Sequence, residues 1–172
     1  MRVCILAFFV AAALCAESVA GLQWTAPAGW LSEGRRPMRA ATYDIRPSAS
    51  DRQGAECAVY YFGPHQGGSV EANVARWKGQ FTHGGKVAPA EVRKRLIHGL
   101  AVTTIDTSGD YSGMGGPMAA HVTVNAGYRL LGAIIEGPEG KIFIKFTGPA
   151  KTVAANHEKF EELLASFQKQ RR

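Results

Sequence analysis

Two methionines and a histidine in a glycine-rich stretch could bind a soft metal ion. Met114, Met118 and His121 lie close together in the sequence, and two thioethers with an imidazole suit Cu(I) outside the cytoplasm. Methionines in such a stretch more often form an adaptable apolar contact surface. We therefore predict that this stretch, with Tyr111, contacts a partner, and we keep a metal site as the alternative.

A second candidate binding segment, residues 63–69, joins a predicted strand to a predicted helix. Gly67, Gly68 and Ser69 come just before the first helical turn, whose free amides could bind an anion. A nucleotide-binding phosphate loop also needs a Lys before the Ser, and this segment lacks it. These three residues are candidate binding residues, and a flexible connection is the simpler interpretation.

The sequence contains no complete catalytic set. Residues 109–113 have the wrong spacing for a nucleophile elbow, and the helix around His157 lacks the second His of a zinc protease. Asp106 and Asp110 could act as a carboxylate pair only if the fold places them in one cleft. We therefore predict a protein that is not an enzyme and that needs no cofactor.

The N-terminus has the layout of a secretory signal peptide. A basic residue precedes an apolar run at 3–14, which is shorter than the roughly 20 residues that a membrane-spanning helix needs. No later segment is long enough to span a membrane either. Ser18 and Ala20 satisfy the small-x-small cleavage rule, so we expect cleavage near Ala20 and a secreted or periplasmic protein. Cleavage after Ala16 is the alternative.

The three cysteines raise the questions of a lipid anchor and of a disulfide. Cys15 ends the apolar run, where bacterial lipoproteins carry their lipid, but Leu14 before it is larger than that modification requires. A lipid anchor is therefore the alternative to plain secretion. Once the signal is removed, Cys57 has no intrachain partner, and its apolar surroundings predict a buried, unreactive thiol.

The composition fits one globular domain. The chain has 172 residues, of which 46% are hydrophobic and 20% charged, so residues 21–172 form a single domain after a signal peptide at 1–20. The net charge of +6 makes the protein basic and favours anionic surfaces. Nucleic-acid binding would need the basic residues on one face with aromatic residues between them, and the sequence does not establish this arrangement, so no nucleic-acid partner is expected. Arg93 and Arg95 are expected to share one face of a strand.

Two amphipathic helices are expected. Ser69 caps the first, at 70–81, in which Val70, Val74, Trp77 and Phe81 form one apolar stripe; residues 83–85 end it. Thr152 caps the second, which extends to 167 and carries His157 on its buried stripe.

Alternation of apolar residues predicts the strands. Strands are expected at 38–46 and 55–62, the second of them central in the sheet. Two more lie within 91–107 on either side of a hinge at His98 and Gly99. A hairpin pairs 128–136 with 141–147, and 108–127 form a loop. The fold class is therefore α+β, with a mostly antiparallel sheet of about six strands and the two helices packed on it.

The two ends of the chain resemble those of PsbP-like domains. The residues that carry the resemblance are Trp24, Pro27, Gly29 and Trp30 at the start, and Phe160, Leu163, Leu164, Ser166 and Phe167 at the end. This superfamily includes the extrinsic photosystem II subunit PsbP, Ran-binding Mog proteins and exported bacterial relatives of unknown function. The resemblance implies an α/β/α sandwich and a non-enzymatic accessory or binding role, and it transfers no catalytic residue.

We therefore predict an exported, non-enzymatic binding or accessory protein that engages a protein partner through the loops at 63–69 and 108–127. The alternative is an extracytoplasmic protein that binds a small ligand or a metal, with an anion at the helix start of Ser69 or Cu(I) at Met114, Met118 and His121.

Overall fold

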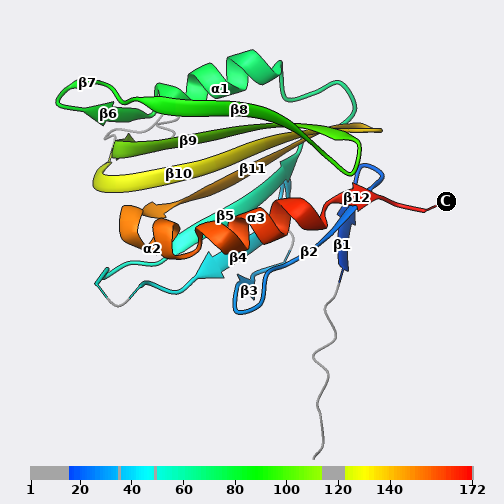
Figure 1. The fold of residues 1–172 in the computed structure, drawn as a ribbon, viewed down its shortest axis with the longest axis horizontal. Coiled ribbons are helices and arrows are strands. Elements are labelled where there is room, and N and C mark those ends of the chain that lie inside the picture. The colour runs from blue at the N-terminus through cyan, green and yellow to red at the C-terminus, as the bar shows by residue number, and fades with distance from the viewer. Residues whose placement is uncertain (1–15, 35, 49, 114–122, 172) are drawn as a thin grey trace, which may run out of the picture.

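The structure is a computed structural model that describes residues 16–34, 36–48, 50–113 and 123–171. A twisted antiparallel sheet separates helix α1 on one face from α2 and α3 on the other (Figure 1). The strands are β1 (Ala16–Val19), β2 (Leu22–Thr25), β3 (Leu31–Ser32), β4 (Arg39–Ile45), β5 (Ala55–Tyr61), β6 (Phe81–His83), β7 (Lys86–Val87), β8 (Ala90–Ile97), β9 (Leu100–Ser112), β10 (Val124–Gly137), β11 (Gly140–Pro149) and β12 (Gln168–Lys169). The helices are α1 (Val70–Lys78), α2 (Ala150–Ala155) and α3 (His157–Ser166).

The predicted fold class is confirmed, but the sheet is larger than predicted. Nine strands pair in the order β3-β4-β5-β11-β10-β9-β6-β7, with β8 also on β9, and β1, β2 and β12 form a separate three-stranded sheet. The expectation of about six strands was too low because β3 and β7 have only two residues each. Such short strands carry no readable alternation and form only because a longer neighbour offers hydrogen bonds.

The hairpin predictions are confirmed. β8 and β9 are joined by His98 and Gly99, whose φ values of 48° and 75° build a two-residue turn. β10 and β11 pair from Gly137 and Gly140 back to Tyr128 and Pro149. The strand predicted as central lies between β4 and β11, as β5.

The prediction of a loop at 108–127 is wrong at both ends, where the structure has strands. Residues up to Ser112 continue β9, and β10 already begins at Val124, with an irregular register between Asn125 and Tyr128. The glycines that suggested a loop are accommodated inside the strands: Gly109 takes a φ of 158°, close to extended, and Gly127 a φ of 67° beside the irregular register. Residues 114–122 lie outside the described part of the chain.

The first helix is shorter than its apolar stripe predicted. Its cap is confirmed, because the Ser69 hydroxyl accepts a hydrogen bond from the Ala72 amide. The helix ends before Gly79, and Gln80 then accepts a hydrogen bond from the Ser112 amide. Phe81 therefore lies buried on β6. Residues 83–85, predicted to end the helix, instead form the last residue of β6, His83, and the turn to β7 at Gly84 and Gly85.

The last helix is split in two, which the sequence did not predict. Thr152 lies inside α2 instead of capping it, and its hydroxyl donates to Asp51. The break falls at Asn156, whose side-chain amide donates to the Thr152 carbonyl and whose Oδ1 accepts from Trp30. His157 follows the break and is exposed, so its predicted burial was wrong.

A separate hydrophobic core covers each face of the sheet. On the α2 and α3 face, Trp24 stacks on Phe167 with ring centroids 4.9 Å apart, so the two ends of the chain meet there. Cys57 is fully buried in this core, as predicted, and burial raises the pKa of its thiol. On the other face, Trp77 of α1 packs with Ile105, Leu130 and Phe143. None of the described helices is long and apolar enough to cross a membrane.

Candidate ligand-binding pocket

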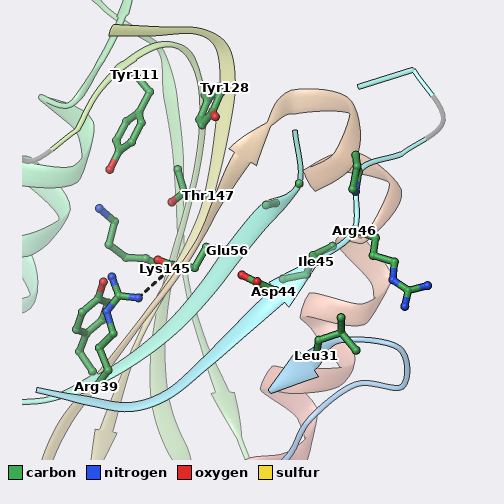
Figure 2. Close-up of a pocket in the computed structure, with 14 residues that line it drawn as sticks. Leu31, Arg39, Asp44, Ile45, Arg46, Glu56, Tyr111, Tyr128, Lys145 and Thr147 are labelled. Carbon is green, nitrogen blue, oxygen red and sulfur yellow. Dashed lines mark ion pairs between the residues drawn. The ribbon is translucent and has the colours of Figure 1, made fainter. Parts of the chain in front are cut away.

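The nine residues of α1 leave part of the sheet uncovered. At 1.5 Å per residue the helix is about 14 Å long. Phe143, Lys145 and Thr147 alternate along one face of β11, and of these Phe143 belongs to the core that α1 covers. Lys145 and Thr147 line a pocket of about 670 Å³ beyond that core (Figure 2). The other lining residues are Leu31, Arg39, Asp44, Ile45, Arg46, Pro47, Gly54, Ala55, Glu56, Tyr60, Tyr111 and Tyr128.

Lys145 is a largely buried cation in this pocket. Its Nζ donates to Gln80 Oε1 at 3.0 Å and lies 5.7 Å from the centroid of the Tyr111 ring. Burial lowers the pKa of Lys145 from 10.5 to about 8, with a further lowering by Arg76 and an opposing effect of Glu56. Lys145 makes no ion pair with any described residue. Its charge is therefore poorly compensated.

Arg39 places a second cation beside Lys145. Its Nη1 forms an ion pair with Glu56 Oε2 at 2.9 Å, and its guanidinium lies 5.3 Å from the centroid of the Tyr60 ring. Nη1 is buried, and Glu56 is its partner within the described chain. Although burial lowers the pKa of Arg39, this contact helps to raise it above its ordinary value. The hydroxyl of Thr147 is buried without a hydrogen-bond partner among the described residues.

Aromatic rings form the walls of the pocket. Tyr111 stacks on Phe81 at 4.9 Å and on Tyr128 at 6.0 Å between centroids. Burial raises the pKa values of Tyr60 and Tyr111, which keeps both hydroxyls protonated near neutral pH. The tyrosines can therefore stack against a planar group and donate hydrogen bonds to it.

These features together suit an anion with a planar body. Arg39 and Lys145 carry two positive charges, and Glu56, which pairs with Arg39, carries a negative charge (Figure 2). Asp44 and Arg46, one charge of each sign, also line the pocket. The arrangement offers charge-assisted hydrogen bonds to a carboxylate or phosphate.

Of the described binding residues that the sequence predicted, one lies in the pocket and three do not. Tyr111 lies on the wall of the pocket, although on a strand rather than in a loop. Gly67, Gly68 and Ser69 do not line the pocket. The side chain of Asn73 donates to the Gly67 and Ser69 carbonyls, and a Cβ on Gly67 would lie 2.5 Å from the Phe143 ring. The contacts described at this segment are those of a packed strand-to-helix connection.

The metal and carboxylate candidates are not assembled in the described part of the chain. Met114, Met118 and His121 lie outside the described residues, so their grouping stays a prediction. Within the described residues no cluster of three or more His, Cys, Asp or Glu side chains could hold a metal ion. Asp106 makes a bidentate pair with Arg129, at 2.8 and 2.6 Å.

A second pocket, of about 410 Å³, lies between β8 and α3. Arg93 and Arg95 both line it, which confirms that they share a strand face. Each is already paired, Arg93 with Glu91 at 2.5 Å and Arg95 with Glu161 at 2.7 Å. Its charges are therefore matched within the protein, unlike those of the first pocket.

Sequence reasoning missed Arg39, Tyr60, Lys145 and Thr147 as pocket residues. They come from β4, β5 and β11, of which β11 is far from the other two along the chain, and no motif links them. One signal was available: Lys145 is a lone charge within the apolar run of β11, between Ile144 and Phe146. A cation in a strand that is otherwise buried calls for a specific partner.

Comparison with known proteins identifies the fold. No known protein family and no curated protein matches the sequence. The solution structure of cyanobacterial PsbP (CyanoP) from Synechocystis sp. PCC 6803 is similar, with 12% identity over 88% of each chain and a TM-score of 0.51. PA94, a Pseudomonas aeruginosa protein of unknown function, is 12% identical over 92% of this chain and 98% of its own, with a TM-score of 0.50. The chain therefore has a PsbP-like fold, as the residues at its two ends indicated.

Proposed function

We propose that this chain is an exported, non-enzymatic binding protein that holds a small organic anion in the pocket beside α1. The observation that carries the proposal is the pair of cations, Arg39 and Lys145, which face one pocket with Glu56 as the neighbouring carboxylate. The PsbP-like fold supports an accessory role without a catalytic centre, and the N-terminal signal supports a secreted or periplasmic location.

The energetics of Lys145 support an anionic ligand. An ammonium that leaves water for a protein interior loses hydration, and a carboxylate partner offsets part of that loss. Among the described residues, Lys145 has only the neutral Gln80 as its hydrogen-bond acceptor, and burial lowers its pKa to about 8. A carboxylate or phosphate entering the pocket would supply the missing negative charge and would stabilise the folded protein as it binds.

The walls of the pocket support a planar ligand body. Tyr111 and Tyr128 stack on one side of the pocket, and Tyr60 lies against Arg39 on another. The Thr147 hydroxyl, which has no hydrogen-bond partner in the described part of the chain, adds a hydrogen-bonding group beside the cations. An aromatic carboxylate such as benzoate matches this set of contacts and fits within about 670 Å³.

Calorimetric titration with benzoate and with inorganic phosphate tests the proposal. Arg39→Gln and Lys145→Met are each expected to weaken benzoate binding by about tenfold or more, because a charge-assisted hydrogen bond contributes about 1.5 to 3 kcal/mol. Glu56→Gln is expected to strengthen it, because the competing carboxylate is removed.

Arg52→Gln is the matched control, since Arg52 is exposed and does not line the pocket. Equal loss of binding in this variant would point to nonspecific attraction by the net charge. If the wild-type protein binds neither anion, the pocket has a different role.

A protein partner remains the second candidate function. The strands that lead into and out of the predicted contact loop, β9 and β10, carry Tyr111 and Tyr128 of the pocket. An aspartate or glutamate side chain of a partner would meet the same cations as a free anion. In that case an acidic peptide with a neighbouring aromatic residue would bind more tightly than benzoate, and Lys145→Met would weaken both.

A further inference from the structure

We infer that Lys145 is a reactive amine that captures aldehydes carrying an anionic group, as a reversible imine in the pocket. This inference rests on the proposed anion-binding function and specifies its ligand class. It adds a covalent step to recognition, with Arg39 as the group that binds the anionic end.

The geometry makes the amine accessible to a ligand. Figure 2 shows the Lys145 side chain leaving β11 and ending in the space between Tyr111 and Arg39. Its aliphatic stem is held within the sheet, while the amine lines the open pocket. Gln80 Oε1, at 3.0 Å, orients Nζ without neutralising it. A ligand whose carboxylate pairs with Arg39 would bring a carbonyl group on its other end toward this amine.

The surrounding charges favour the neutral, nucleophilic amine. Burial lowers the pKa of Lys145 most, and Arg76 on α1 and Arg39 on β4 lower it further. Glu56 on β5 raises this pKa, but by less than the other three effects together lower it. Tyr60 and Tyr111 stay protonated because burial raises their pKa values. A desolvated lysine beside other cations is the usual setting for imine formation in proteins.

The reaction needs no redox partner. The Nζ lone pair attacks the carbonyl carbon, and the resulting carbinolamine loses its oxygen as water. The aldehyde and the amine thus become an imine and one water molecule, and hydrolysis reverses the step.

Trapping with 4-formylbenzoate and cyanoborohydride tests this inference on the whole protein. The expected product is one secondary amine at Lys145, with a mass gain equal to the aldehyde less one oxygen atom, located by peptide mapping. Its initial rate is expected to rise by more than about tenfold between about pH 6 and about pH 8, following the neutral amine. Excess benzoate is expected to suppress the labelling.

Two variants separate reactivity from binding. Lys145→Arg keeps the positive charge but cannot form the imine, so it is expected to bind 4-methylbenzoate and to lose the adduct. Lys151→Arg is the matched control, because Lys151 is exposed and outside the pocket, and it is expected to keep the adduct. Circular dichroism confirms that each variant is folded.

The outcomes distinguish this inference from the proposed function. Labelling spread evenly over the lysines, or unchanged in Lys145→Arg, overturns the reactive amine. If 4-methylbenzoate still binds and depends on Arg39 in that case, the anion-binding function stands without the covalent step. If neither the aldehyde nor 4-methylbenzoate binds, both proposals fail.

Discussion

Lys145 shows how a single residue can favour a binding site at the expense of stability. It is a charged residue of β11 whose neighbours Ile144 and Phe146 are fully buried. The fold positions its amine next to Arg39 rather than next to a carboxylate of its own. Residues with strongly shifted pKa values in a pocket are characteristic of functional sites.

Lys145→Met is expected to stabilise the protein near neutral pH. The folded protein holds Lys145 with a pKa of about 8 and the unfolded chain with 10.5, so between these values the unfolded chain binds more protons and stability rises with pH. The variant lacks this dependence. Its advantage should be on the order of 3 kcal/mol at about pH 7 and should shrink toward pH 10.

Urea unfolding of both proteins at the two pH values measures this difference. Lys151→Met, at an exposed position, serves as the control and is expected to change stability little at either pH. A variant that is less stable than the wild type at neutral pH would show that the Lys145 charge is well compensated in the fold.

Helix α1 determines where the pocket lies, and the packing of α1 against the sheet depends on a glycine of β10. A Cβ on Gly132 would lie 2.8 Å from the Trp77 ring and 2.8 Å from Ile105. Trp77 is 2% exposed and is the largest side chain by which α1 packs on the sheet. The absence of a side chain at position 132 therefore permits the close contact between the helix and the strand.

Gly132→Ala is expected to destabilise the protein by about 1 to 3 kcal/mol, because the added methyl group overpacks this contact. Gly79→Ala, at the end of the same helix, is the control. Gly79 has a φ of −64°, and the new Cβ would make only ordinary contacts at 3.5 Å. Chemical denaturation monitored by tryptophan fluorescence compares the two. Equal stability of Gly132→Ala and the wild type would show that α1 shifts freely on the sheet.

At the scale of the whole molecule, the two ends of the chain close the core under α3. Trp24 on β2 stacks on Phe167 after α3, and its Nε1 donates to the Tyr43 hydroxyl. That hydroxyl in turn donates to Glu17 on β1, which pairs with β2 through a turn at Ala20 and Gly21. Strand β1 therefore takes part in a hydrogen-bond network that reaches the buried Trp24 and Tyr43.

If the predicted signal peptide is removed, the two predicted cleavage sites would give chains of different stability. A chain of residues 17–172 retains Glu17, whereas a chain of residues 21–172 loses β1 and leaves the Tyr43 hydroxyl without this acceptor. We expect the longer form to be more stable by about 1 to 3 kcal/mol. Thermal unfolding of the two forms tests this, and Glu17→Gln in the longer form isolates the hydrogen bond. Equal stabilities would show that β1 contributes nothing to the folded domain.

Several local elements could be predicted because they depend on contacts between residues that are close in the sequence. The cap at Ser69, the turn at His98 and Gly99, and the hairpin of β10 with β11 each depend on contacts within a few residues, so their signals are readable in order along the chain. The buried Cys57 and the α+β class follow from apolar patterning in the same way. The end motifs pointed to the PsbP-like fold because their residues form its core.

The short strands, the break at Asn156 and the pocket could not be predicted, because they depend on contacts between residues that are far apart in the sequence. Phe81 has a helical spacing from Trp77, but hydrogen bonds offered by β9 draw it into β6. The pocket joins Arg39, Tyr111 and Lys145, which lie far apart in the sequence. Strand pairing brings them together, and the pairing of distant strands cannot be predicted from local sequence patterns.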